Sequence, residues 1–150
     1  MSLPEAPRHT LRLVLRDDLE ALSAAQIAIA GFLRGQGAGP RTTARAELLL
    51  EELALNTLRY GFAAGSVPEL AVTAWHDGSH CGLDIEDRGT AFDPTTAALP
   101  APAPTLRQAS TGGRGVSLLR RTAAELAYER TADGRNRLHL VLPAEDASIG

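Results

Sequence analysis

Lysine is absent from this sequence. All 15 basic residues are arginines, so the chain can hold neither the lysine of a Walker A loop nor the strand-borne lysine of eukaryotic-type protein kinases. Schiff-base chemistry, which requires a lysine amine, is excluded as well. The missing residue type therefore rules out several lysine-dependent kinds of site.

Cysteine is almost absent too. The one cysteine, Cys81, cannot form an internal disulfide, and no grouping of cysteine and histidine has the spacing of a zinc site. The formal net charge is -3, which disfavours the basic surface of a dedicated nucleic-acid-binding protein. Small molecules and other proteins are therefore the expected partners, and nucleic acid is not.

Long apolar runs are missing as well. No stretch is long enough to cross a membrane, and the opening residues MSLPEAPRHT lack the apolar segment of a signal peptide. What is present is 150 residues of 44% hydrophobic composition, enough for a globular domain with a sizeable core. We therefore expect a single domain over residues 1–150 in a cytoplasmic protein that does not associate with a membrane.

The apolar patterns predict the order strand, two helices, two strands, loop, helix, two strands. This order indicates an α/β two-layer sandwich, in which a mixed, mostly antiparallel sheet has helices on one face. The expected strands are 9–15, 69–76, 81–87, 125–131 and 137–142, and the first two helices span about 19–33 and 40–60. The residues of the second helix that we expect to face the core are Ala44, Leu48, Leu55 and Leu58.

Two polar residues stand beside the apolar stripe of that second helix. In LLLEELALNTLRYGF, Glu52 and Asn56 are four residues apart, so they lie one turn apart on the same face and can address one ligand. Glu51, one step round the helix, is expected to be a solvated surface charge. Taken alone, the pair is more typical of the polar fringe of an ordinary amphipathic helix.

A second motif, EDRGTAFDP, ends the strand expected at 81–87. By the period of two, Asp87 shares the inward face with the preceding leucine and isoleucine, so its carboxylate needs hydrogen-bonding partners. A strand-end carboxylate followed by Gly89 can accept a hydrogen bond from an exocyclic amine while the glycine lets a flat base approach. Phe92 is expected to pack beneath the loop, and Asp93 with the following proline to turn the chain. An ordinary strand-end turn explains the same residues equally well.

A third motif, TGGRGV, runs from Thr111 to Val116 and precedes an expected helix. Glycines that open a helix present free backbone N–H groups and a positive dipole end, which together bind phosphate. Gly113 and Gly115 are the candidates, and Arg114 between them could stabilise transferred charge or simply face solvent. The signal alone is weak, because the third glycine of a dinucleotide fingerprint is missing.

The segment between the second and third motifs differs in composition. TTAALPAPAPTLRQAS, residues 95–110, is rich in alanine and proline, and its X-Pro steps disfavour both helix and central strand. We therefore expect a loop or lid over about residues 95–112.

Taken together and in this order, the three motifs resemble those of the Bergerat-fold ATPases, the superfamily of type II topoisomerases, histidine kinases and mismatch-repair ATPases. More closely, EELALNTLRYGF, DIEDRGTAFDP and GGRGVSLLRRTA are similar to the serine/threonine kinases that act as anti-sigma factors in bacterial partner-switching modules. The resemblance covers nearly the whole chain. It has two departures: Tyr60 stands where the family often has histidine, and Asn136 lies where relatives commonly carry threonines near the base.

The resemblance implies ATP and Mg²⁺ as cofactors. It implies that Asp87 accepts a hydrogen bond from the adenine 6-amino group and that Asn56 binds Mg²⁺ through its amide oxygen. Glu52 would be the general base that orients the attacking hydroxyl for transfer of the γ-phosphoryl group. The other residues implied to contact the nucleotide are Gly89, Phe92, Asp93, Thr111, Gly113, Arg114, Gly115 and Val116.

Protein partners follow from the same resemblance. It implies phosphorylation of a small anti-anti-sigma protein of the STAS fold, binding to a sigma factor or another output protein, and a homodimer. A non-catalytic module that sequesters its partner under control of ATP is one alternative, which the intact Glu52 disfavours. The detached ATPase domain of a histidine kinase is another, disfavoured because no phosphoacceptor helix precedes the domain and the lid lacks a further glycine box. A structural protein without nucleotide would need three ordered motifs by coincidence.

Overall fold

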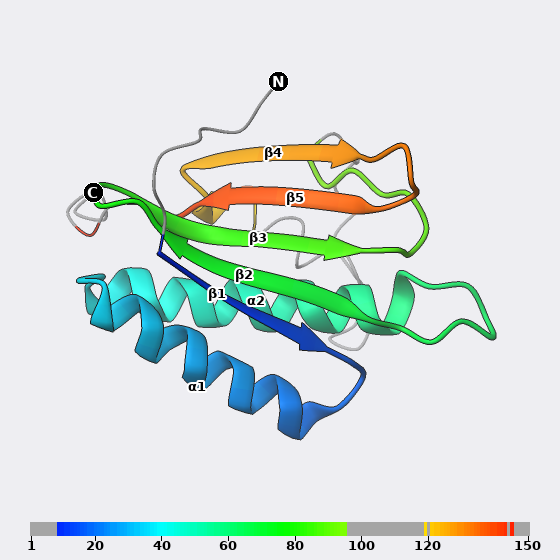
Figure 1. Ribbon diagram of the computed structural model, residues 1–150, viewed down its shortest axis with the longest axis horizontal. Helices are drawn as coiled ribbons and strands as arrows, with labels where there is room; N and C mark the ends of the chain where they lie inside the picture. Colours follow the sequence, from blue (N-terminus) through cyan, green and yellow to red (C-terminus); the bar gives the residue numbers. More distant parts are fainter. Residues whose placement is uncertain (1–8, 96–118, 120, 144, 146–150) are drawn as a thin grey trace, which may run out of the picture.

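The computed structural model describes residues 9–95, 119, 121–143 and 145. The described elements form two layers, a sheet of five strands and a pair of helices that cover one of its faces (Figure 1). This arrangement confirms the predicted α/β two-layer sandwich with helices on one face. In chain order the elements are β1 (His9–Leu15), α1 (Leu19–Gly35), α2 (Pro40–Tyr60), β2 (Leu70–His76), β3 (Cys81–Asp87), β4 (Glu125–Arg130) and β5 (Asn136–Val141).

The sheet has the strand order β1-β2-β3-β5-β4, and every strand pair in its described part is antiparallel. Tight turns favour this pairing, since they can join only antiparallel neighbours. In the turn between β2 and β3, Gly78 has φ 94° and the Asp77 carboxylate accepts hydrogen bonds from the N–H groups of His80 (2.7 Å) and Ser79 (2.9 Å). Those two hydrogen bonds lower the pKa of Asp77 below its ordinary value of 3.8.

The two helices begin in different ways. Asp18 caps α1 by accepting hydrogen bonds from two N–H groups of the first turn. Helix α2 follows Gly39, which has no side chain to cap it. The carboxylate of Glu145, beyond the last strand, takes that place and accepts hydrogen bonds from the N–H groups of Arg41 and Thr42, both at 3.0 Å. The start of α2 is therefore closed by a residue from the far end of the chain.

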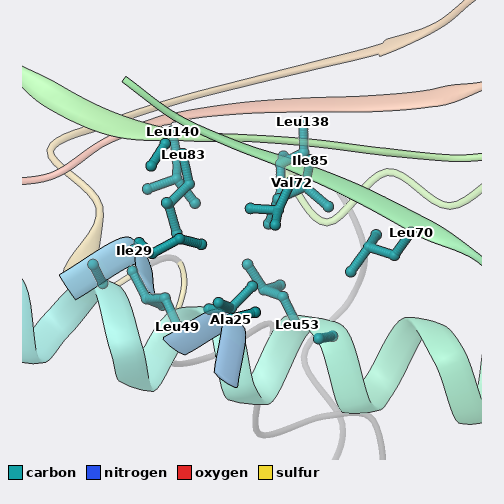
Figure 2. Close-up of a cluster of buried hydrophobic side chains, with 14 of the residues drawn as sticks. Ala25, Ile29, Leu49, Leu53, Leu70, Val72, Leu83, Ile85, Leu138 and Leu140 are labelled. Carbon is teal, nitrogen blue, oxygen red and sulfur yellow. The ribbon is translucent and has the colours of Figure 1, made fainter. Parts of the chain in front are cut away.

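The hydrophobic core lies between the helices and the inner face of the sheet, where leucine, isoleucine and valine side chains of both layers meet (Figure 2). Of the predicted inward residues of α2, Leu58 is buried and Leu55 is partly buried. The predictions for Ala44 and Leu48 are wrong, because both are exposed, Leu48 at 45%. Three consecutive leucines allow more than one helical phase, and packing against α1 and the sheet selects the other one. The buried residues of α2 in the core are Ala46, Leu49, Leu50, Leu53, Ala54 and Leu58.

The third predicted helix falls mostly outside the described residues. At its end, Leu119 is fully buried in the core, and its carbonyl oxygen accepts a hydrogen bond from the Ala123 N–H at 3.0 Å. Among the helices of the described part, none combines the length and apolar composition that crossing a membrane requires.

Candidate functional site

The carboxylate of Asp87, at the end of β3, is held by the protein itself. Its Oδ1 atom accepts hydrogen bonds from the Gly89 N–H (2.8 Å) and from Nδ2 of Asn136 (2.9 Å). Asp87 and Asn136 are paired in the β3–β5 register, so the sheet brings the two side chains together. Within the described residues no hydrogen bond reaches Oδ2 of Asp87. This oxygen is left to accept a hydrogen bond from a ligand.

Gly89 is required by the way its loop meets the end of α2. A Cβ atom at this position would lie 2.2 Å from the carbonyl oxygen of Gly61, and the next residue, Thr90, donates its N–H to that same oxygen at 2.8 Å. On the other side, Nη1 of Arg130 donates to the Gly89 carbonyl oxygen at 2.8 Å. The loop after β3 is therefore fixed between α2 and β4. Close approach of a base to Gly89, the predicted reason for the glycine, stays a prediction.

Asn136 is buried, and each of its polar atoms has two partners. Besides Asp87, Nδ2 donates to the carbonyl oxygen of Thr90 at 3.0 Å. Oδ1 accepts hydrogen bonds from the N–H of Phe92 (3.3 Å) and the hydroxyl of Tyr128 (2.5 Å). The sequence pointed to Asn136 only as a departure from the family and did not identify Tyr128. The alternation along β4, which places Tyr128 on the inward face, was the signal available.

Two predictions about the following loop have different outcomes. Phe92 does not pack beneath the loop: it is 47% exposed, although its N–H donates a hydrogen bond to Oδ1 of Asn136. Asp93 makes the predicted turn, since its Oδ1 atom accepts hydrogen bonds from the N–H (2.8 Å) and the hydroxyl (2.5 Å) of Thr95. Contact of Phe92 and Asp93 with a nucleotide stays a prediction.

Glu52 and Asn56 lie on one edge of α2, as predicted, because the helix is unbroken from Pro40 to Tyr60. Both are half-buried. The Oδ1 atom of Asn56 is buried and has no hydrogen-bond partner among the described residues. An amide oxygen left in this way costs free energy, and it is the kind of ligand that a hard cation prefers. Asn56 therefore fits a Mg²⁺ ligand, and Glu52 forms no hydrogen bond or ion pair within the described part of the chain.

Arg45 is a residue of this edge that the sequence analysis did not select. It precedes Glu52 by seven residues, which is two turns of α2 and the same side of the helix. Its Nη1 atom is buried and has no hydrogen-bond partner in the described residues. A guanidinium group in that position is chemically suited to an anionic oxygen. The spacing of seven was the available signal.

The third motif cannot be placed in this geometry. Thr111, Gly113, Arg114, Gly115 and Val116 all lie outside the described residues, and so does the predicted lid after Thr95. The described part of the site therefore consists of the α2 edge and the end of β3.

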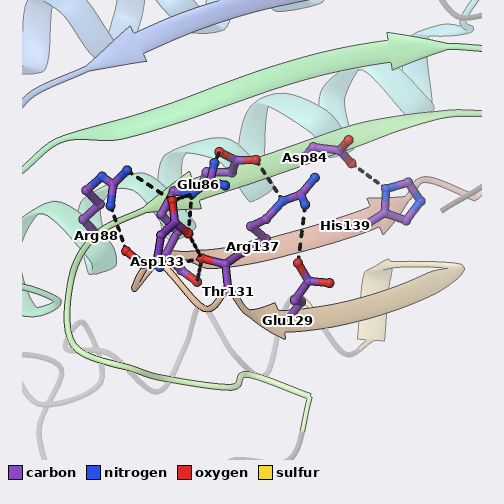
Figure 3. A network of polar contacts seen from close by, with 9 residues as sticks. Asp84, Glu86, Arg88, Glu129, Thr131, Asp133, Arg137 and His139 are labelled. Atoms are coloured by element: carbon purple, nitrogen blue, oxygen red, sulfur yellow. Dashed lines mark hydrogen bonds and ion pairs between the residues drawn. The ribbon is translucent and has the colours of Figure 1, made fainter. Parts of the chain in front are cut away.

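The opposite face of the sheet carries charges that neutralise one another (Figure 3). Glu86, which the period of two places on the side of β3 away from Asp87, pairs with Arg135 and Arg137, both at 2.9 Å. In the turn between β4 and β5, a hydrogen bond from the Thr131 hydroxyl and a second one from Arg135 lower the pKa of Asp133 to about 2. Since the charges of this network are already paired, the network is a poorer candidate for an anionic ligand than the α2 edge.

A family model described as "Histidine kinase-like ATPase domain" matches residues 15–142. The serine/threonine-protein kinase BtrW of Bordetella bronchiseptica is 34% identical over 100 residues, which are 67% of this chain and 68% of that protein. The family model confirms the predicted resemblance to the superfamily that includes the histidine kinases, and the relative is itself a serine/threonine-protein kinase.

A solved structure has the same fold. The crystal structure of the RsbU and RsbW domains of Rv1364c from Mycobacterium tuberculosis matches 91% of this chain with a TM-score of 0.59 and 17% identity. The chain spans 34% of the length of that protein chain, so the likeness concerns the fold of one part of it.

Proposed function

Because the chain belongs to the histidine kinase-like ATPase domain family, we propose that it is a single-domain, ATP-dependent serine/threonine kinase that acts on a regulatory protein. One observation carries the proposal: the buried Oδ1 atom of Asn56, which has no hydrogen-bond partner among the described residues, lies on the same helix edge as Glu52. This pair combines a metal ligand with a candidate base one turn away. Oδ2 of Asp87, at the end of β3, adds an acceptor suited to the adenine 6-amino group.

Each of the proposed site residues would have a separate role in phosphoryl transfer. Asn56 would hold Mg²⁺ through Oδ1, and the ion, when bound, neutralises charge on the phosphate oxygens. Glu52 would accept the proton of the acceptor hydroxyl while the hydroxyl oxygen attacks the γ-phosphorus and the bond to the ADP oxygen breaks. The backbone N–H groups of Gly113 and Gly115 would hold the phosphates, under a lid over about residues 95–112.

The acceptor hydroxyl would belong to another protein. We propose a small anti-anti-sigma protein of the STAS fold as the phosphorylated partner, a sigma factor or other output protein as a second partner, and a homodimer as the assembly. The 34% sequence identity to the protein kinase BtrW and the fold shared with an RsbW domain support the proposal of regulatory protein partners. The proposed location is the cytoplasm.

Replacement of Glu52 separates a kinase from a module that only binds ATP. In Glu52→Gln the amide keeps the size of the side chain but cannot take the hydroxyl proton. ATP and Mg²⁺ binding should persist, while phosphoryl transfer slows by about 10²–10⁴-fold. The measurement is incorporation of labelled phosphate from ATP into the candidate STAS partner, alongside a calorimetric titration with ATP.

Glu51→Gln is the matched control, because it makes the same chemical change one position earlier on α2, at a residue that is also half-buried. This control should transfer phosphate at the wild-type rate. If Glu52→Gln transfers at that rate too, Glu52 is not the base. If the wild type binds ATP but modifies no such partner, the protein is a binding module and not a kinase.

A further inference from the structure

Asn136 occupies the place where a family threonine was expected near the base, but its contacts indicate a different role. It is 7% exposed, and both of its Nδ2 hydrogens and both Oδ1 lone pairs have protein partners. No polar valence is left for a ligand. Asn136 therefore cannot contact a nucleotide by hydrogen bonding without first giving up a bond to the protein.

The orientation of this amide follows from its neighbours. The N–H of Phe92 can only donate, so it must face the amide oxygen, and the carbonyl oxygen of Thr90 can only accept, so it must face the amide nitrogen. With the nitrogen on that side, the second N–H is directed to Oδ1 of Asp87, 2.9 Å away. The hydroxyl of Tyr128 completes the arrangement by donating to the amide oxygen.

We propose that Asn136, held by Tyr128, is a positioning residue that turns Asp87 so that a single oxygen, Oδ2, is presented to a 6-aminopurine. The inference rests on the proposed function and adds the origin of its base selectivity. Two donors, Asn136 Nδ2 and the N–H of Gly89, occupy Oδ1 and oppose rotation of the carboxylate. The remaining oxygen accepts from a 6-amino group and repels a 6-oxo group.

The charged group next to this network is already engaged. Arg130, on the neighbouring strand β4, donates to the carbonyl oxygen of Gly89 and is not directed at the carboxylate in any described hydrogen bond. The donors to Oδ1 of Asp87 are therefore the amide of Asn136 and a backbone N–H. Changing the amide should alter Asp87 directly.

Asn136→Asp tests the proposal, because it keeps the shape of the side chain and replaces the donor by a carboxylate. At pH 7.5 the new carboxylate opposes Oδ1 of Asp87, and ATP affinity should fall by roughly tenfold or more. GTP affinity should not fall in parallel, since a 6-oxo group gains no hydrogen bond from the Asp87 acceptor. As the pH falls towards 5.5, the loss of ATP affinity relative to the wild type should shrink. Protonation of one of the two facing carboxylates, that of Asp87 or the introduced one, restores a hydrogen-bond donor between them.

Tyr128→Phe gives a milder form of the same test, since it removes one hydroxyl from the network. ATP affinity should fall by about two- to tenfold, again without a parallel fall in GTP affinity. Leu126→Ala is the matched control on the same face of β4: it removes packing from a partly buried residue and no part of the network. It should lower the melting temperature and leave the ratio of ATP to GTP affinity unchanged.

The measurements are calorimetric titrations with ATP and with GTP, each with Mg²⁺, after melting curves have shown that every variant folds. Unchanged ATP affinity in both network variants, or an equal loss for ATP and GTP without acid recovery, overturns the positioning role. Should Asn136→Asp fail to fold, Tyr128→Phe decides by the same ATP to GTP ratio. A wild type that binds no ATP overturns the proposed function itself, which is a different result.

Discussion

The two described ends of the candidate site differ in how far the protein satisfies its own polar groups. At the end of β3, Oδ1 of Asp87 and every polar atom of Asn136 have protein partners. On the edge of α2, Oδ1 of Asn56 and Nη1 of Arg45 are buried and have no hydrogen-bond partner within the described residues. The end of β3, which we propose as the base site and call the base end, is therefore built in advance, whereas the α2 edge retains polar groups suited to a metal ion and an anion.

This contrast between the end of β3 and the edge of α2 bears on how a nucleotide would bind. A carboxylate that is already oriented loses little freedom on binding, so it can select a base at low cost. Groups that lack partners can bind a metal ion and a phosphate group without first breaking bonds within the protein. We infer that the base end determines which nucleotide binds and the α2 edge determines what happens to it.

The largest predicted effect comes from breaking the base end at Asp87→Asn. Oδ1 lies between two donors, so the new amide should keep its oxygen there and present its nitrogen where Oδ2 was. That nitrogen faces the adenine amine, donor against donor, and ATP affinity should fall by about 10²–10⁴-fold with the fold intact. Calorimetry with ATP measures this loss.

The same variant should bind a 6-oxo purine relatively better, because an amide N–H can donate to that oxygen. A titration with GTP checks the gain, and a melting curve checks the fold. ATP affinity equal to that of the wild type would rule out Asp87 as the adenine acceptor.

An intermediate effect is expected at the α2 edge. Asn56→Ala removes the oxygen that we propose as the metal ligand, so ATP affinity should fall by about 10–100-fold when Mg²⁺ is present. With EDTA in place of Mg²⁺, the variant and the wild type should bind ATP equally, because the lost group served the metal ion. Equal losses under both conditions would show that Asn56 acts on the nucleotide or the fold, and the contrast between the two ends would need another explanation.

The smallest effect on the site is expected at the far end of α2, where Glu145 closes the helix. Hydrogen bonds from the N–H groups of Thr42 and then Arg41 lower the pKa of Glu145 below its ordinary value of 4.5. Glu145→Gln should lower the melting temperature by a few degrees near pH 7 and leave ATP affinity unchanged.

The sign of the pH dependence follows from that lowered pKa. The folded protein binds the Glu145 proton more weakly than the unfolded chain, so the stabilisation is complete above about pH 4.5 and is lost as the pH falls through the pKa of the folded state. The gap between the melting temperatures of the wild type and Glu145→Gln should therefore close in acid. A gap that stays constant down to pH 3 would count against this cap.

Local sequence patterns predicted much of the secondary structure correctly. The strand at residues 9–15 and the helix at 40–60 follow from apolar periodicity, and their predicted bounds agree with β1 and α2. The spacing of Glu52 and Asn56 likewise depends only on helix geometry.

Other predictions failed where more than one local solution existed. Consecutive leucines in α2 left undecided which side of the helix faces the core. Leu48 was therefore expected inside, but it is 45% exposed. Phe92 was expected beneath its loop, yet it is 47% exposed, and its N–H donates a hydrogen bond to Asn136. For α2, packing against α1 and the sheet decided which residues lie inside.

The sequence alone determined the layers of the fold, the order of the motifs and the two carboxylates on which the function is proposed. It did so because helix and strand periods act over a few residues. Only the tertiary structure decided what surrounds those carboxylates: Asn136 reaches Asp87 across 49 residues, and Glu145 reaches α2 across more than a hundred. No local pattern encodes such contacts, since they depend on strand register and on where the chain returns after the last strand.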